Sequence, residues 1–313
     1  MARPASPELP ARPLEARQIQ AALTTRLLGH GKLLRIVPRL GSTNLVLLEE
    51  ARLGLAGEGT VLLAEEQTGG RGRGDHRWES PPGMGLYLSA LLRPTLPPER
   101  LGLVTLACGV AVCETCAQAG VCAQLRWPND VLVRGRKLAG ILCELVSPPS
   151  RTTTFPTAGP GAGRSAPADG EEALLVVAGI GLNVALDPAT LPPPLDAQAT
   201  SLLRERQQCG PAAAGRAAAE LLPLDRSLLA AHLLDRLEQR LDQCAGAPTA
   251  LLAAWEQRWP DRRRRVEVLD GPVGIPEGTA IGVSESGALL LLDVPGRPGV
   301  VQLLSGSARA LEP

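Results

Sequence analysis

Apolar segments of strand length follow one another along the middle of this chain without a helical segment between each pair. Strands are expected at residues 61–65, 86–92, 124–127, 131–133, 138–146 and 174–184. Long helices are expected at residues 100–120 and 226–243, where apolar side chains recur at helical spacing. Regular alternation of strands and helices would predict a doubly wound parallel sheet. The irregular order instead predicts an α+β fold, a mixed β-sheet with helices packed on one side.

The remaining parts of the chain differ in pattern. At the N-terminal end, a loose tail and a helix at 14–28 are expected. At the C-terminal end, Gly and Pro separate short apolar segments, as in a small barrel; these segments are at 266–269, 278–283, 288–292 and 300–304. Residues 147–172 are rich in Pro, Thr, Gly, Ala and Ser and predict a solvated insert, whereas the loose stretch 186–218 is expected to order partly over a ligand. We therefore expect three parts, at 1–35, 36–260 and 261–313.

Residues 69–74 read Gly-Gly-Arg-Gly-Arg-Gly and follow the apolar run that ends at Ala64. The glycines allow backbone amides to approach a ligand closely, and the guanidinium groups of Arg71 and Arg73 are strong donors to oxyanions. Tandem Arg-Gly repeats are typical of RNA-binding tails. Because this motif occurs once, between apolar segments and ahead of Trp78, it predicts an anion-binding loop instead.

A second polar cluster refines this prediction. Residues 126–130 read Arg-Trp-Pro-Asn-Asp, and residues 136–140 read Arg-Lys-Leu-Ala-Gly. Transfer of a carboxylate to an α-phosphate gathers negative charge, which fixed cations stabilise effectively. The candidates for these fixed cations are Arg71, Arg73 and Lys137. Together, the two clusters predict nucleotide-dependent activation of a carboxylate.

Taken together, these motifs resemble those of the biotin protein ligases. The resemblance rests on five segments in the family's order, namely Ser-Thr-Asn at 42–44, Gln67 with Gly-Arg-Gly-Arg at 70–73, Trp-Pro-Asn-Asp at 127–130, Arg-Lys-Leu-Ala-Gly-Ile-Leu at 136–142 and Gly-Ile-Gly-Leu-Asn at 179–183. It covers residues 35 to 310. It implies a ligase core like that of class II synthetases, followed by an SH3-like domain. Only 40 residues precede Gly41, so a ligase without the DNA-binding repressor domain of some relatives is expected.

The resemblance also implies an activity and a set of site residues. Biotin and ATP would form biotinyl-adenylate, and a lysine of a biotin carboxyl carrier protein, such as an acetyl-CoA carboxylase subunit, would then accept biotin. The implied catalytic residues are Lys137, Arg71, Arg73 and Asp130, the last either as a base or only orienting the lysine. Biotin would contact Ser42, Thr43, Asn44, Gln67, Arg71, Gly72, Arg73, Lys137 and Gly140. The nucleotide or adenylate would contact Arg71, Arg73, Arg126, Asn129, Lys137, Gly181 and Asn183.

Simpler structural roles exist for some of these residues. Ser42 precedes a helical segment and is a candidate N-cap. Asp130 follows Pro-Asn and is equally suited to a turn, and Asn183 to a turn cap. Cys113 and Cys116 form a C-x-x-C pair, but they fall in an apolar helical segment, so buried packing is favoured over zinc binding. The sequence shows no cluster of metal ligands, and Mg²⁺ is expected with the phosphates.

Composition limits the other classes of function. Lys plus Arg equals Asp plus Glu at 32 each, which argues against a dedicated nucleic-acid binder. Neither a membrane-spanning run nor a signal peptide is expected, and the seven scattered cysteines fit a reduced, cytoplasmic protein. Two alternatives remain. A lipoate or octanoyl ligase shares the fold but lacks the Gly-Arg-Gly-Arg loop, and a non-enzymatic biotin or nucleotide sensor would bind without turnover.

Overall fold

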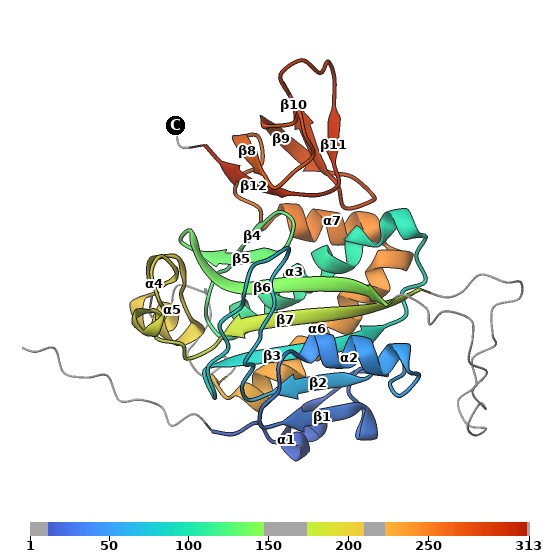
Figure 1. Cartoon of the computed structure of the whole chain (residues 1–313), viewed down its shortest axis with the longest axis vertical. Coiled ribbons are helices and arrows are strands. Elements are labelled where there is room, and N and C mark those ends of the chain that lie inside the picture. Colours follow the sequence, from blue (N-terminus) through green and yellow to red (C-terminus); the bar gives the residue numbers. More distant parts are fainter. Residues whose placement is uncertain (1–11, 147–173, 210–222, 312–313) are drawn as a thin grey trace, which may run out of the picture.

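The computed structural model describes residues 12–146, 174–209 and 223–311 (Figure 1). The expected insert at 147–172 and most of the expected N-terminal tail lie outside these ranges. The description that follows concerns the described residues alone.

A mixed sheet forms the centre of the molecule. Its strands are β1 (Leu34–Val37), β2 (Val61–Ala64), β3 (Gly85–Leu92), β4 (Gln124–Arg126), β5 (Asp130–Val133), β6 (Arg136–Val146) and β7 (Leu175–Asn183). The order across the sheet is β1-β2-β3-β7-β6-β5-β4. β1 and β2 are parallel, and the other neighbouring pairs are antiparallel. The prediction of an α+β fold with a mixed sheet is confirmed.

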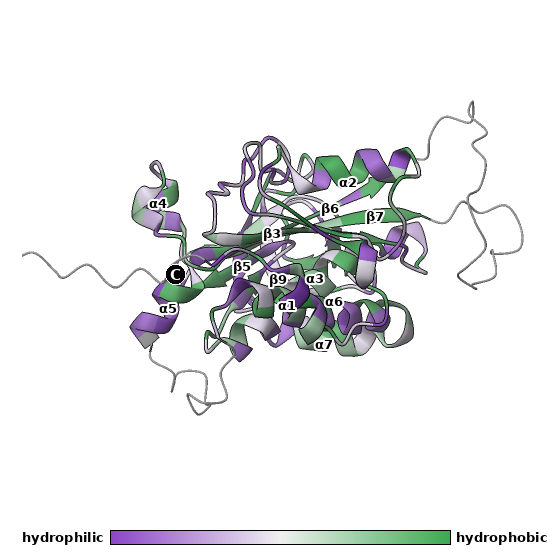
Figure 2. Ribbon diagram, turned by 90° about the horizontal axis from the view of Figure 1, so that it is seen from below, coloured by the Kyte–Doolittle hydropathy of each residue, from purple (hydrophilic) through white to green (hydrophobic). Residues whose placement is uncertain are grey.

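Helices cover this sheet unequally (Figure 2). One face carries α1 (Ala16–Ala22), α3 (Gly102–Gln118), α6 (Arg226–Gly246) and α7 (Pro248–Glu256). The other face carries α2 (Thr43–Arg52), so the expectation that helices lie on one side holds for most of them. Short helices also occur, namely η1 (Gly31–Leu33), η2 (Pro98–Arg100), η3 (Pro188–Thr190), α4 (Leu195–Gln198) and α5 (Leu202–Cys209).

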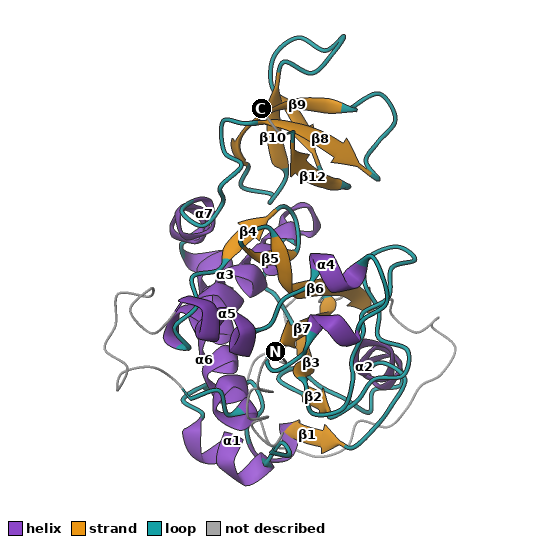
Figure 3. Ribbon diagram, turned by 90° about the vertical axis from the view of Figure 1, so that its left-hand side faces the viewer, coloured by secondary structure: helices purple, strands orange, loops and turns teal. Residues whose placement is uncertain are grey.

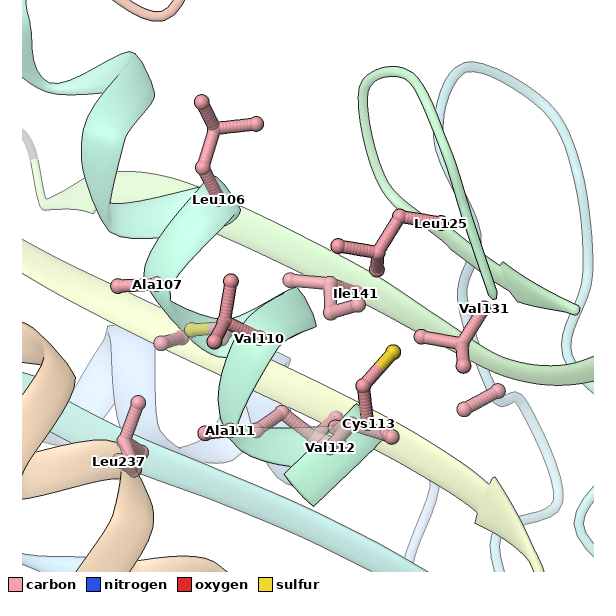
Figure 4. Close-up of a cluster of buried hydrophobic side chains, with 14 of the residues drawn as sticks. Leu106, Ala107, Val110, Ala111, Val112, Cys113, Leu125, Val131, Ile141 and Leu237 are labelled. Atoms are coloured by element: carbon pink, nitrogen blue, oxygen red, sulfur yellow. The ribbon is translucent and has the colours of Figure 1, made fainter. Parts of the chain in front are cut away.

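The core lies between the sheet and α3. This helix is apolar on nearly all sides, and a helix of this kind is stable in water only when it is surrounded by protein. Figure 4 shows Val110 and Cys113 of α3 beside Ile141 of β6 and Val131 of β5. The segment Pro98–Gln118 is long and apolar enough to cross a membrane, but 67% of its most apolar window is buried in the fold. Cys113 and Cys116 are both buried, as the apolar spacing predicted.

A second, antiparallel sheet follows α7 (Figure 3). Its strands are β8 (Arg265–Leu269), β9 (Glu277–Val283), β10 (Leu289–Leu292), β11 (Val301–Leu303) and β12 (Ser307–Ala310), in the order β11-β10-β9-β8-β12. This arrangement confirms the small all-β unit expected at the C-terminal end. The Trp127 indole donates from Nε1 to the carbonyl oxygen of Gly287 at 3.0 Å, which joins this sheet to the turn between β4 and β5.

The helix expected at 14–28 is shorter than predicted, because the residues after α1 bond to α6 instead of continuing the helix. The Glu238 carboxylate accepts hydrogen bonds from the backbone N–H groups of Arg26, Leu27 and Leu28 at 2.6, 3.0 and 3.1 Å. Burial acts to raise the pKa of Glu238, but these donors outweigh it and lower the pKa from its ordinary value of 4.5. Glu238 therefore stabilises the fold when it is ionised.

We expect Glu238→Gln to lower the free energy of unfolding at pH 7 by about 1 to 2 kcal/mol, since the charge that three amides share is lost. Because the folded-state pKa is depressed, this contribution is present above the unfolded pKa and disappears as the pH falls through the folded value. Urea denaturation at pH 7 and at lower pH measures the effect. Glu49→Gln, at a carboxylate whose side chain is 61% exposed, is the control. Equal effects of the two variants at pH 7 would contradict the prediction.

Candidate active site

Strand register brings four of the predicted site residues into one row across the sheet. Arg126 of β4 pairs with Asp130 of β5, Asp130 with Gly140 of β6, and Gly140 with Gly181 of β7. Directly paired residues direct their side chains to the same face. Residues as far apart in sequence as Arg126 and Gly181 therefore form one surface, with an acidic and a basic group beside a floor of two glycines.

The Trp78 indole covers this glycine floor. A Cβ atom added at Gly181 would lie 2.4 Å from Trp78 Nε1, and one added at Gly140 would lie 3.2 Å from Trp78 Cζ3. Gly181 therefore needs to be glycine for the ring to approach, whereas a side chain at Gly140 would require the ring to shift by a few tenths of an ångström. Trp78 Nε1 is buried and has no hydrogen-bond partner among the described residues. The sequence placed Trp78 beside a functional motif but did not assign it a site role.

Trp78 belongs to the Gly-Arg loop, which folds back as an irregular hairpin. The Trp78 backbone N–H donates to the Gly70 carbonyl oxygen at 3.0 Å, and the Gly72 N–H donates to the His76 carbonyl oxygen at 2.7 Å. A Cβ at Gly70 would lie 2.2 Å from the Trp78 carbonyl oxygen. Glycine at this position thus lets the two sides of the loop meet, in addition to any role toward a ligand.

Lys137 and Asp130 form an ion pair beside the floor. Lys137 Nζ lies 2.6 Å from Asp130 Oδ1 and 5.7 Å from the centre of the Trp78 ring. Both side chains are partly exposed, at 38% and 24%. The ammonium group is therefore held by a carboxylate and an aromatic face while it still reaches solvent.

A neutral polar cluster lies at the start of α2. Gln67 Oε1 accepts from the Thr43 backbone N–H at 2.8 Å and from Thr43 Oγ1 at 3.0 Å. Ser89 Oγ of β3 lies 2.7 Å from Thr43 Oγ1 and 2.5 Å from Asn44 Oδ1. Sequence reasoning missed Ser89, although a lone serine in the apolar segment 86–92 was the available signal. Ser42 is the N-cap residue of α2 and is buried, but its side chain makes no capping hydrogen bond.

Glu144 connects this cluster to the Gly-Arg loop, and sequence reasoning missed it as well. Arg71 Nη1 donates to Glu144 Oε1 at 2.9 Å, and Asn44 Nδ2 donates to Glu144 Oε2 at 3.0 Å. Asn44 packs directly on β7, because a Cβ at Gly179 would lie 2.1 Å from Asn44 Oδ1. Gly179 of β7 thus makes room for the Asn44 side chain, as Gly181 does for the Trp78 ring.

The other basic candidates point elsewhere. Arg73 donates from Nη1 to the carbonyl oxygen of Gly306, in the turn before β12 of the second sheet. Arg126 lies near Asp261; burial raises the pKa of Asp261 despite the opposing charges of Arg126 and Arg264. Arg71, Arg73 and Lys137 are therefore not gathered at one point. Each has its own protein acceptor, because a cation in a partly buried site is stabilised by the nearest carboxylate or carbonyl.

Two asparagines from the motifs hold backbone. Asn129 Nδ2 donates to the Ile141 carbonyl oxygen at 2.8 Å, and Asn183 Nδ2 donates to the Thr200 carbonyl oxygen at 3.0 Å. Their amide groups therefore fix the strands and the loop that border the floor.

Comparison with known proteins agrees with this arrangement. Residues 36–155 match the model of the biotin/lipoate A/B protein ligase family. Over 299 residues the chain is 34% identical to the biotin--[acetyl-CoA-carboxylase] ligase of Mycobacterium tuberculosis, an alignment that covers 92% of this chain and 93% of that protein. The chain belongs to this ligase family.

Other members of the biotin/lipoate A/B protein ligase family align over similar lengths. The bifunctional ligase/repressor BirA of Bacillus subtilis is 30% identical, with 89% of this chain and 74% of that protein covered. The biotin protein ligase of Aquifex aeolicus, solved in complex with biotin and ATP, superposes with a TM-score of 0.63 at 25% identity and covers 91% of this chain and 98% of that one.

In this family member, the polar groups fall into two sets on either side of the glycine floor. Neutral hydroxyl and amide groups lie at the start of α2, with the Arg71–Glu144 ion pair beside Asn44, and a charged set surrounds Lys137 and Asp130. A ligand that crosses the floor would meet neutral hydrogen-bonding groups at one end and an ammonium group at the other. This polarity suits a molecule with an uncharged polar head and a carboxylate tail.

Proposed function

We propose that this chain is an ATP-dependent biotin protein ligase, which forms biotinyl-5′-AMP and then transfers biotin to a lysine of a biotin carboxyl carrier protein. The observation that carries the proposal is the glycine floor of Gly140 and Gly181, with the Lys137–Asp130 pair at one end and the Thr43–Gln67 cluster at the other. The resemblance of the motifs and the match to named biotin ligases support the same activity.

In the first half-reaction, a carboxylate oxygen of biotin attacks the α-phosphorus of ATP, and pyrophosphate leaves. The Lys137 ammonium forms an ion pair with Asp130 in this structure. It can exchange this partner for the biotin carboxylate and an α-phosphate oxygen. Arg71 and Arg73 would supply further donors from the Gly-Arg loop, and Arg126 lies in the same row as Asp130. Fixed cations here lower the cost of the charge that gathers at phosphorus.

The neutral cluster is the proposed site of the biotin head group. Thr43, Asn44, Gln67 and Ser89 offer donors and acceptors without net charge, which matches a cyclic urea. Ser42 is buried beside them. Gly72, Gly140 and Gly181 would allow backbone to approach the bound molecule closely, and Asn129 and Asn183 would shape the nucleotide side by holding the surrounding backbone.

In the second half-reaction, the ε-amine of the acceptor lysine attacks the acyl carbonyl, and AMP leaves. Once Lys137 has turned to the substrate, the Asp130 carboxylate becomes available to orient the amine and to take its proton. We assign these steps to residues 36–260 and place the enzyme in the cytoplasm.

Magnesium would arrive with the nucleotide. Mg²⁺ is usually held by one or two carboxylates together with substrate phosphates. The described residues contain no group of three or more His, Cys, Asp or Glu side chains suited to a metal ion. The phosphate oxygens would therefore be its main ligands, and Mg²⁺ would neutralise their charge.

Mass spectrometry of a biotin carrier domain after incubation with this enzyme, ATP and Mg²⁺ tests the proposal. We expect the carrier to gain one biotinyl group when biotin is supplied and to stay unmodified with lipoate or octanoate. Modification by lipoate or octanoate alone would identify the chain as the other kind of ligase in its family. Binding of biotin without pyrophosphate release would identify a sensor and refute the proposal.

A further inference from the structure

The segment that carries α4 and α5 contains buried polar side chains that the mechanism above does not use. Thr200 and Glu205 are both 0% exposed. The segment runs beside the start of β6, where Ala199 forms an isolated parallel bridge with Lys137. A buried hydroxyl and a buried carboxylate next to the proposed catalytic lysine require an explanation, because burial of either group is costly unless it is bonded.

Thr200 uses all of its polar groups to connect site elements. Its backbone N–H donates to the Lys137 carbonyl oxygen at 2.9 Å, and its own carbonyl oxygen accepts from Asn183 Nδ2 at 3.0 Å. Its hydroxyl donates to Glu205 Oε1 at 2.5 Å. One residue thus connects the start of β6 to the end of β7 and to α5.

Glu205 holds the turn of the β5–β6 hairpin. Its Oε1 also accepts from Arg136 Nη2 at 2.6 Å, and its Oε2 forms an ion pair with Arg134 Nη2 at 3.0 Å, without hydrogen-bond geometry. Arg134 and Gly135 form the turn, with φ angles of 50° and 76°. The carboxylate therefore binds side chains on both sides of a tight turn that only Arg136 separates from Lys137.

The sheet alone does not fix the backbone at this point. The β5–β6 register shifts between Val131 and Leu132, opposite the segment that carries Lys137. A bulge of this kind interrupts the regular ladder of hydrogen bonds and re-aims the side chains next to it. The hydrogen bond from Thr200 gives the Lys137 backbone a partner at a position that the pairing of β6 with β7, which begins at Ala139, does not reach.

We propose that Thr200 and Glu205 are positioning residues for the adenylation reaction, which fix the backbone of Lys137 so that its ammonium group meets the carboxylate and the α-phosphate. The inference rests on the proposed function. A reacting group that is displaced by about 1 Å loses on the order of 100-fold in rate, so the support of a long, flexible side chain matters as much as its charge.

The first test compares Thr200→Val, Thr200→Ser and Thr115→Val in steady-state assays of pyrophosphate release. Valine removes the hydroxyl but keeps the shape and the backbone groups. Thr115 is the matched control, because it is also 0% exposed and donates only within α3, to the Ala111 carbonyl oxygen, apart from a contact with His232. We expect Thr200→Val to lower kcat about tenfold with KM for biotin changed less than about threefold, and Thr200→Ser to recover most of the rate.

The second test uses Glu205→Gln, with Glu114→Gln as its control. Glu114 of α3 also binds two arginines, Arg240 and Arg258, but neither belongs to the β5–β6 hairpin. Both variants lose a largely buried carboxylate, so a merely structural role predicts similar losses of thermal stability and similar kcat. We expect kcat to fall in Glu205→Gln alone, by about tenfold.

Equal kcat for the Thr200 and Thr115 valine variants, with the same result for the glutamine pair, would overturn the inference. The proposed function fails in a different way. If the wild-type enzyme releases no pyrophosphate from ATP with biotin, the activity is wrong whatever the variants do.

Discussion

Replacement of Lys137 with alanine is expected to lower the rate of pyrophosphate release with biotin and ATP by about 10³-fold, a value at the upper end for loss of one fixed donor to a developing charge. The ammonium is the one compact cation at the glycine floor, where it lies 2.6 Å from Asp130. Removal of the ammonium also leaves the Asp130 carboxylate without its partner. A single-turnover assay of pyrophosphate release measures the effect.

The lysine content of the chain provides a natural control. Arginine supplies all but two of the 32 basic residues, and the second lysine, Lys32, is exposed in η1. Lys32→Ala should leave the rate unchanged within about twofold. Lys137→Arg is expected to recover little activity, because a guanidinium is larger and directs its donors differently. Full activity of Lys137→Ala would remove Lys137 from the mechanism.

Replacement of Gly181 with valine is expected to weaken biotin binding by about 10- to 100-fold, the range that corresponds to the cost of overpacking a well-packed site. A Cβ at this position would lie 2.4 Å from Trp78 Nε1 and 2.5 Å from Trp78 Cε2. The strand cannot move easily, because β7 is hydrogen bonded on both sides. A valine side chain would therefore displace the Trp78 ring, or any molecule that takes its place on the glycine floor.

Isothermal titration calorimetry with biotin measures this change. Gly57→Val is the matched control, because a Cβ at Gly57 has no neighbour within 4 Å. The control should bind biotin as the wild type does. Wild-type affinity in a folded Gly181→Val variant would show that the glycine floor is not part of the biotin site.

Local sequence pattern predicted the strands of the central sheet well, because each long strand is an apolar run bounded by turn residues. β1 and β12 were not predicted. Both have only four residues, and each is defined by pairing with a strand that is distant in sequence, β2 at Val61 and β8 at Arg265. Pairing of this kind leaves no periodic signal within so short a segment.

The motifs located the site but not all of its members. Ser89, Glu144, Thr200 and Glu205 lie outside the recognised segments and enter the site through strand register or through a loop that packs on the hairpin. The expectation that three cations form one cluster was also too simple. The sequence shows how many charges a site has, whereas the fold decides which acceptor each cation binds. Arg71 donates to the Glu144 carboxylate, and Arg73 donates to the Gly306 carbonyl oxygen.

The contact between Arg73 and Gly306 has a consequence for how the chain responds to heat and to proteases. Together with the bond between Trp127 and Gly287, it ties the terminal sheet to the Gly-Arg loop and to the turn between β4 and β5. We therefore expect the two sheets to unfold in a single cooperative transition. Cleavage after residue 260 is expected to slow the proposed reaction, because the severed portion supplies the carbonyl oxygen that accepts from the Arg73 guanidinium.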